Sequence, residues 1–148
     1  MSGDIILRVW PQEVGGKSFP DVPQHIGEAA DEAYRCYSIN AHRAATLLAR
    51  SVIEATAKEM GITNGQLFSK IEALHDRGLI REYVRDGAHE VRYLGNDMAH
   101  GDFVDSIEPA DTELALSLMD AVLEEIFQAP ARVNAARARR LARSQAQP

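Results

Sequence analysis

The sequence contains a single cysteine, few aromatic residues and no long apolar run. Cys36 has no second cysteine with which to form an internal disulfide or a zinc ribbon, so we expect a cytoplasmic protein. No stretch reaches the roughly 18 apolar residues of a membrane span. Residues 1–10 also lack the basic start and apolar run of a signal peptide. We therefore expect no partner in a membrane.

Several motifs of catalytic and cofactor sites are also missing. Neither Gly61 nor Gly65 is followed by the Lys-Ser/Thr pair of a phosphate-binding loop. There is no Gly-x-Ser-x-Gly elbow for a serine nucleophile. Asp97, His100 and Asp102 lie close together in sequence, but a second histidine at fixed spacing is absent, which argues against a metal. We expect neither a metal nor a cofactor.

The composition is that of one ordinary folded domain. The chain has 148 residues, of which 45% are hydrophobic and 26% charged, enough apolar material to bury a core without disulfides. Its formal net charge of −6 is unevenly distributed: residues 132–148 hold five arginines and no acid, whereas the preceding residues hold 11 basic and 22 acidic side chains.

An acidic body repels phosphate, so only the arginine tail has the charge to hold RNA or DNA. The alternative for the tail is a solvated helix end that folds back on the acidic body, since short basic ends are common and this one has no aromatic residue for stacking bases.

Apolar residues recur every three to four positions in several stretches, which is the spacing of amphipathic helices. The expected helices cover residues 24–38, 40–60, 65–77, 88–100 and 111–128. One or two further turns are expected over residues 79–85, before a break at Asp86 and Gly87. Helices joined by short loops predict an all-α bundle of about five helices.

Capping and breaking residues set the expected helix ends. Asn40 suits the N-cap of the second helix and Gly61 its end. Asp111 or Thr112 suits the cap of the last helix, which Pro130 is expected to close. The chain then divides into an extended lead-in over residues 1–22, a bundle over residues 23–130 and a basic Ala/Arg tail over residues 131–148.

The most informative segment lies just before Gly101. On a helix, Arg92, Asn96 and His100 form one polar stripe, because each step of four residues drifts by only about 40°. A guanidinium, an amide and an imidazole together can bind a phosphate and move a proton near neutral pH. Gly95 allows another segment to approach closely. The alternative is an interhelical hydrogen-bond cluster that binds no ligand. The apolar residues expected to face the core are Val91, Leu94 and Met98.

The block from Arg92 to His100, which reads Arg-Tyr-Leu-Gly-Asn-Asp-Met-Ala-His, resembles the signature of the domain-of-unknown-function family 4145, a branch of the HEPN superfamily. The resemblance covers most of the chain. Its other parts are the lead-in at Pro20 and Pro23, the triplet Leu48, Ala49 and Arg50, the short helix with Leu67 and Ile71, and the acidic last helix that ends near Pro130.

The resemblance implies a helical bundle that forms a homodimer, with the motif helices facing each other across the two-fold axis. Such modules are often found in prokaryotic defence, toxin–antitoxin and restriction systems. Active members are metal-independent ribonucleases, whose motif is an arginine, a polar residue directly after it and a histidine a few positions later. Here His100 matches the histidine and Asn96 the polar residue, but Gly95 stands in the position of the arginine.

This departure leaves three hypotheses. The first is a small dimerising module of defence or phage-conflict type that binds RNA or a nucleotide at Arg92, Gly95, Asn96 and His100, with weak or no catalysis. The second is a metal-independent endoribonuclease in which His100 transfers the proton, Arg92 stabilises phosphate charge and Asn96 positions the substrate. The third is a purely structural dimer. A protein partner, such as an antitoxin or a restriction-type subunit, is a further expectation.

Overall fold

The computed structural model describes residues 14–147. All the regular secondary structure within these residues is helical, which confirms the predicted all-α class. Most of the lead-in predicted for residues 1–22 lies outside the described residues, and residues 14–19 have no regular secondary structure. The elements are α1 (Gln24–Ser38), α2 (His42–Glu59), α3 (Leu67–Asp76), α4 (Glu82–Ala99), α5 (Pro109–Leu123), the π-helical segment η2 (Glu124–Gln128) and α6 (Ala129–Ala146).

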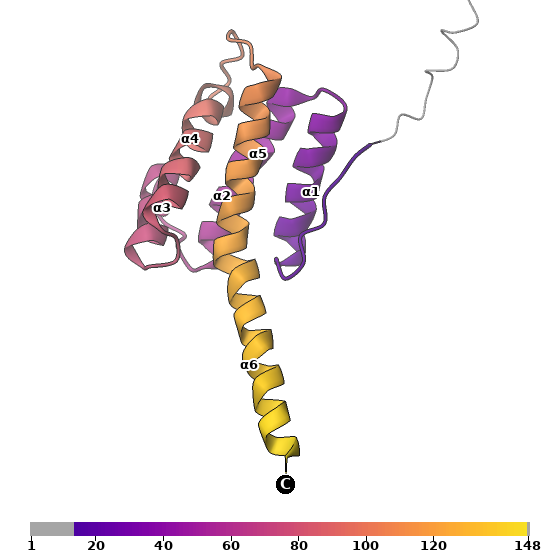
Figure 1. Cartoon of the computed structure of the whole chain (residues 1–148). Helices are drawn as coiled ribbons and strands as arrows, with labels where there is room; N and C mark the ends of the chain where they lie inside the picture. Colours follow the sequence, from indigo (N-terminus) through magenta and orange to yellow (C-terminus); the bar gives the residue numbers. More distant parts are fainter. Residues whose placement is uncertain (1–13, 148) are drawn as a thin grey trace, which may run out of the picture.

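Helix α2 is the centre of the bundle. It packs against α1, α3, α4 and α5, while α4 also packs against α3 and α5. Figure 1 shows α1 on one side of α5 and the pair α3 and α4 on the other, with α2 behind. The largest fully buried side chains come from α1, α2, α3 and α5: Ile26, Ile53, Ile71, Leu74, Leu116, Met119 and Leu123. Burial of these side chains provides the main stabilisation of the fold.

The turn between α1 and α2 shows that the role predicted for Asn40 was wrong. Asn40 has a positive φ of 64°, and it ends α1 instead of capping α2. Its backbone N–H donates to the Tyr37 carbonyl, and that of Ala41 donates to the Cys36 carbonyl, the pair of bonds that closes a Schellman motif. Asparagine tolerates this left-handed conformation better than most residues, so it can replace the usual glycine. Gly61, with a φ of 85°, ends α2 as predicted.

The break predicted at Asp86 and Gly87 is also wrong, because α4 runs without interruption from Glu82 to Ala99. Gly87 is buried, and a Cβ atom placed there would lie 2.8 Å from the Leu118 side chain on α5. The glycine therefore permits close contact between α4 and α5. Tertiary packing outweighs its helix penalty of about 1 kcal/mol relative to alanine.

Helix α5 begins earlier than predicted, at Pro109. Proline fixes φ for the first helical turn and loses no hydrogen bond there, so it starts the helix without Asp111 or Thr112 as a cap. Thr112 is instead fully buried, and its hydroxyl lies 3.2 Å from that of Thr46 on α2. This pair satisfies two polar groups inside the core.

Pro130 does not close the last helix, contrary to the prediction. The chain continues through the π-helical segment η2 into α6, in whose first turn Pro130 lies. Inside a regular α-helix, proline would remove a hydrogen bond and collide with the carbonyl four residues earlier. The wider π turn relieves this conflict, so α5, η2 and α6 form one rod (Figure 1).

The basic tail is therefore helical, and it does not fold back on the acidic body. No residue of α6 is buried, and the only described element that it packs against is η2. Figure 1 shows α6 extending away from the end of the bundle. None of the described helices combines the length and the apolar character needed to cross a membrane.

Candidate functional site

The polar stripe predicted on α4 lines one cleft. Arg92, Asn96 and His100 all contribute to its wall, as the helical spacing predicts. Helices α2 and α3 complete a cleft of about 280 Å³ with Arg50, Glu54, Gln66, Leu67 and Phe68. This volume is just below the usual range of small-molecule sites, which begins near 300 Å³, so it suits a phosphate with its sugar better than a large ligand.

Gly95 lies where the side chain of Arg50 from α2 meets α4. It is buried, and a Cβ atom placed there would lie only 3.0 Å from Cδ and 3.6 Å from Cβ of Arg50. The aliphatic part of the Arg50 side chain therefore passes directly over the glycine. The resemblance placed an arginine at position 95, and the structure brings the side chain of another arginine next to that position from α2.

The guanidinium of Arg50 has an unused donor. Its Nε atom is shielded from solvent and has no hydrogen-bond partner among the described residues. A buried guanidinium N–H without an acceptor costs about 1–3 kcal/mol or more. An anion that reached this N–H from the cleft would remove this cost, so Arg50 is the residue of the cleft lining with an unmet hydrogen bond.

Glu54 lies one helical turn from Arg50, and its carboxylate is bonded to a lysine of α3. Its carboxylate accepts a hydrogen bond of 2.8 Å from Nζ of Lys70, a lysine whose side chain is only 5% exposed. This bond lowers the pKa of Glu54, and the charges of Lys70, Lys58 and Arg50 lower it further. Glu54 is thus ionised at neutral pH, and it accepts its hydrogen bond from Lys70 and not from Arg50.

Arg92 is held in place by aromatic neighbours. Its Cζ lies 5.2 Å from the ring centre of Phe68 and 4.2 Å from that of Tyr93. Its Nε donates to Nδ1 of His89, so Nε2 of that histidine carries the proton and donates to Glu72. These contacts fix the guanidinium at the cleft without a carboxylate bonded directly to it.

His100 lies at the C-terminal end of α4, where its backbone N–H donates to the carbonyls of Asn96 and Asp97. Its side chain is exposed, so it can exchange protons with solvent. His100 thus adds an imidazole to a cleft with two arginines.

These features make the cleft cationic on an acidic body. Arg50 and Arg92 form no ion pair within residues 14–147, and the one carboxylate in the lining is already bonded to Lys70. Arginines bind phosphate through paired N–H donors, and Asn96 adds an amide. The half-exposed ring of Phe68 offers a surface for stacking a base. The arrangement can hold an anion and transfer a proton.

Sequence reasoning identified the α4 residues but assigned no site role to Arg50, Glu54 or Phe68. Arg50 was noted only as the last residue of the Leu48-Ala49-Arg50 triplet. The available signal for Arg50 was its place in a predicted helix whose neighbouring residues are mostly apolar and face the core. Its position over Gly95 depends on how α2 packs on α4, which helical periodicity does not specify.

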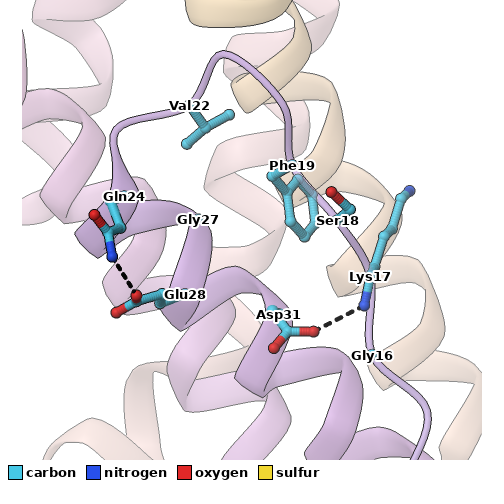
Figure 2. A pocket seen from close by; sticks show the side chains of 9 residues that line it. All are labelled: Gly16, Lys17, Ser18, Phe19, Val22, Gln24, Gly27, Glu28 and Asp31. Atoms are coloured by element: carbon cyan, nitrogen blue, oxygen red, sulfur yellow. Dashed lines mark hydrogen bonds between the residues drawn. The ribbon is translucent and has the colours of Figure 1, made fainter.

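A second, larger groove of about 470 Å³ lies between α1 and the segment before it (Figure 2). The Lys17 backbone N–H donates to Asp31 there, and its ammonium pairs with Asp120. That ammonium also lies within 6 Å of the ring centres of Phe19 and Tyr34. Lys17 is therefore satisfied within the protein, and this groove offers no free cation to a ligand.

The side chains of residues 14–147 do not gather three histidine, cysteine or acidic residues in a geometry that could hold a metal. Asp97 and His100 therefore lack the third ligand that a metal site needs. What the cleft offers a ligand is its two guanidinium groups and Asn96.

Comparison with protein-family models gives one match, to the family described as Domain of unknown function (DUF4145), over residues 31–143. The chain belongs to this family. The match covers well over half of the chain and includes the whole cleft, and it extends into α6. Searches of the curated proteins and of the solved structures gave no match.

The bond between Lys70 and Glu54 makes the stability of this DUF4145 domain depend on pH. Because the pKa of Glu54 is lowered in the folded state, the bond stabilises the fold above the ordinary glutamate pKa of about 4.3. This stabilisation is lost as the pH falls through the lowered value. We expect Lys70→Met to reduce the free energy of unfolding by about 1–3 kcal/mol at pH 7 and by much less at pH 3, in urea titrations.

Lys58→Met is the matched control, because Lys58 is half exposed and lies 3.9 Å from the same carboxylate. It should change the free energy of unfolding by less than about 1 kcal/mol. An equal loss for Lys70→Met at both pH values would show that Lys70 contributes only through packing.

Proposed function

We propose that this domain is a small, dimerising HEPN-like module of prokaryotic defence systems that binds an anionic ligand, RNA or a nucleotide, in the cleft between α2, α3 and α4. The single observation that carries this proposal is the buried Nε donor of Arg50, which has no hydrogen-bond partner within residues 14–147. Arg50 lines the same cleft as Arg92, Asn96 and His100. The phosphate of the ligand accepts from both guanidinium groups, and Asn96 orients it.

Geometry also supports a preference for a nucleotide over a free inorganic anion. Phe68 is half exposed at the rim of the cleft, next to the guanidinium of Arg92 that it already contacts. A base that follows the bound phosphate can stack on this ring, which adds about 1–3 kcal/mol of affinity. The homodimer proposed for this module places the two α4 helices face to face, where Tyr93 is 61% exposed.

Removing the cleft arginines should weaken binding. We expect Arg50→Gln and Arg92→Gln each to raise the Kd for a labelled single-stranded RNA octamer at least about tenfold in fluorescence anisotropy, because each loses a charge-assisted bond to phosphate. Arg50→Lys keeps the charge but loses the Nε donor, so its Kd for the same RNA should lie between those of Arg50→Gln and the wild type.

Arg77→Gln is the matched control, since it removes the same charge from an exposed residue outside the cleft. It should leave the Kd within about twofold of the wild type. Wild-type affinity in Arg50→Gln would refute binding in the cleft. If the cleft variants instead change the mass measured by light scattering and leave RNA affinity unchanged, the polar stripe serves dimerisation alone.

A second candidate function, a metal-independent endoribonuclease, is favoured by the position of Arg50 over Gly95. In this mechanism His100 takes the proton of a ribose 2′-hydroxyl, whose oxygen attacks the adjacent phosphorus. The phosphorus–O5′ bond then breaks, O5′ takes up a proton from water, and His100 later releases its proton to solvent, which leaves a 2′,3′-cyclic phosphate and a 5′-hydroxyl. Arg50 and Arg92 stabilise the charge that develops on the phosphoryl oxygens.

Cleavage of total cellular RNA in the presence of EDTA separates the two candidates. An endoribonuclease of this kind should cleave RNA with EDTA present. His100→Ala should lower the cleavage rate at least about 100-fold, because a general acid–base usually contributes that much or more. His75→Ala, a change at a half-buried histidine outside the cleft, controls for the loss of an imidazole. The binding module predicts no cleavage by any of these proteins.

A further inference from the structure

The exposed helix α6 has a charge unlike that of the rest of the chain. It contains five of the 16 basic residues and none of the 22 acidic residues, so the remaining sequence has a formal charge of −11. Only Arg132 is paired, with Glu124 of η2. Within residues 14–147, the other four arginines make no ion pair: Arg137, Arg139, Arg140 and Arg143.

Four of the five arginines lie along one side of α6. At about 100° per residue, Arg132, Arg139 and Arg143 fall within about 40° of one another, and Arg140 extends this arc to about 100°. Four alanines flank this arc on one side: Ala131, Ala135, Ala138 and Ala142. Opposite the arc lie Asn134, Leu141 and Gln145. The helix therefore presents a line of guanidinium groups about 16 Å long from Arg132 to Arg143.

This line of charge is unfavourable for an isolated helix. Arg139 and Arg143 are four residues apart, and Arg140 and Arg143 are three apart, so each pair repels by about 0.2–0.5 kcal/mol. The bundle does not offset this repulsion, since no residue of α6 is buried. A partner with closely spaced negative charges would offset it along the full length of the helix.

We propose that α6 is an arm that binds duplex DNA through its phosphates, independently of the cleft. Duplex DNA carries one negative charge for about every 1.7 Å of its axis, so it offers a phosphate to each arginine of the row, whose members lie about 5 Å apart on average along the helix axis. Because α6 projects in line with α5 away from the bundle (Figure 1), it contacts the phosphates while the acidic body stays clear of them.

The side chains of α6 favour a duplex over a single strand. Proteins that bind single strands stack bases on aromatic side chains, and α6 has none. An α-helix fits the major groove of B-form DNA, which is about 12 Å wide, whereas the deep groove of double-stranded RNA is too narrow for it. The family match reaches residue 143, so the arm lies mostly inside the DUF4145 domain.

The test compares two double variants of the full chain that lose the same charge. Fluorescence anisotropy with a labelled 20-base-pair DNA duplex is measured from 50 to 200 mM NaCl. We expect Arg139→Gln with Arg143→Gln to weaken binding at least tenfold at 50 mM and to reduce the slope of log K against log salt by about 2. Arg77→Gln with Arg81→Gln, on the body, should change the Kd by less than about twofold.

Two further measurements keep this proposal separate from the cleft. Arg50→Gln should leave duplex binding unchanged, and the α6 variant should leave binding of 5′-AMP unchanged. Far-UV circular dichroism checks that the α6 variant remains helical.

Three results would overturn the DNA-binding arm. They are no duplex binding by the wild type at 50 mM NaCl, equal losses in the α6 and body variants, and a change from dimer to monomer in the α6 variant with duplex affinity unchanged. The last result would show that α6 binds a second copy of the chain instead.

Discussion

The contact between Arg50 and Gly95 determines what the cleft can do. A Cβ atom at position 95 would come within 3.0 Å of the Arg50 side chain, so the glycine sets how closely α2 and α4 approach there. The Nε atom of that side chain is shielded from solvent and has no acceptor among the described residues. Glu54, one helical turn from Arg50 on α2, accepts a hydrogen bond from Lys70 of α3 instead. The cleft thus keeps its positive charge available.

Charge divides the molecule into three regions with different chemistry. The body is acidic, the cleft between α2, α3 and α4 has two arginines without carboxylate partners, and α6 has five arginines and no acid. In an acidic protein, two such concentrations of arginines restrict where a polyanion can bind. The net charge of −6 alone would have argued against any such ligand.

Local patterns predicted much of this fold, and long-range packing determined the rest. The first helix was predicted to its observed ends, and the spacing of Arg92, Asn96 and His100 correctly predicted that they would share one surface. Gly87 and Pro130 were wrongly predicted to break helices, because their effects depend on Leu118 and on a π turn. The position of Arg50 could not be predicted for the same reason: α2 and α4 meet only in the folded bundle.

Nuclear magnetic resonance of the arginine Nε–H groups tests the central claim most directly. Arg50→Lys identifies the Arg50 signal by its loss, and inorganic phosphate is then titrated against chloride at constant ionic strength. If the buried donor is an anion site, phosphate shifts the Arg50 signal in a saturable manner, while that of Arg77 on the surface moves little. An Arg50 signal that shifts no more than the Arg77 signal, or that does not respond to phosphate at all, would contradict an anion site in the cleft.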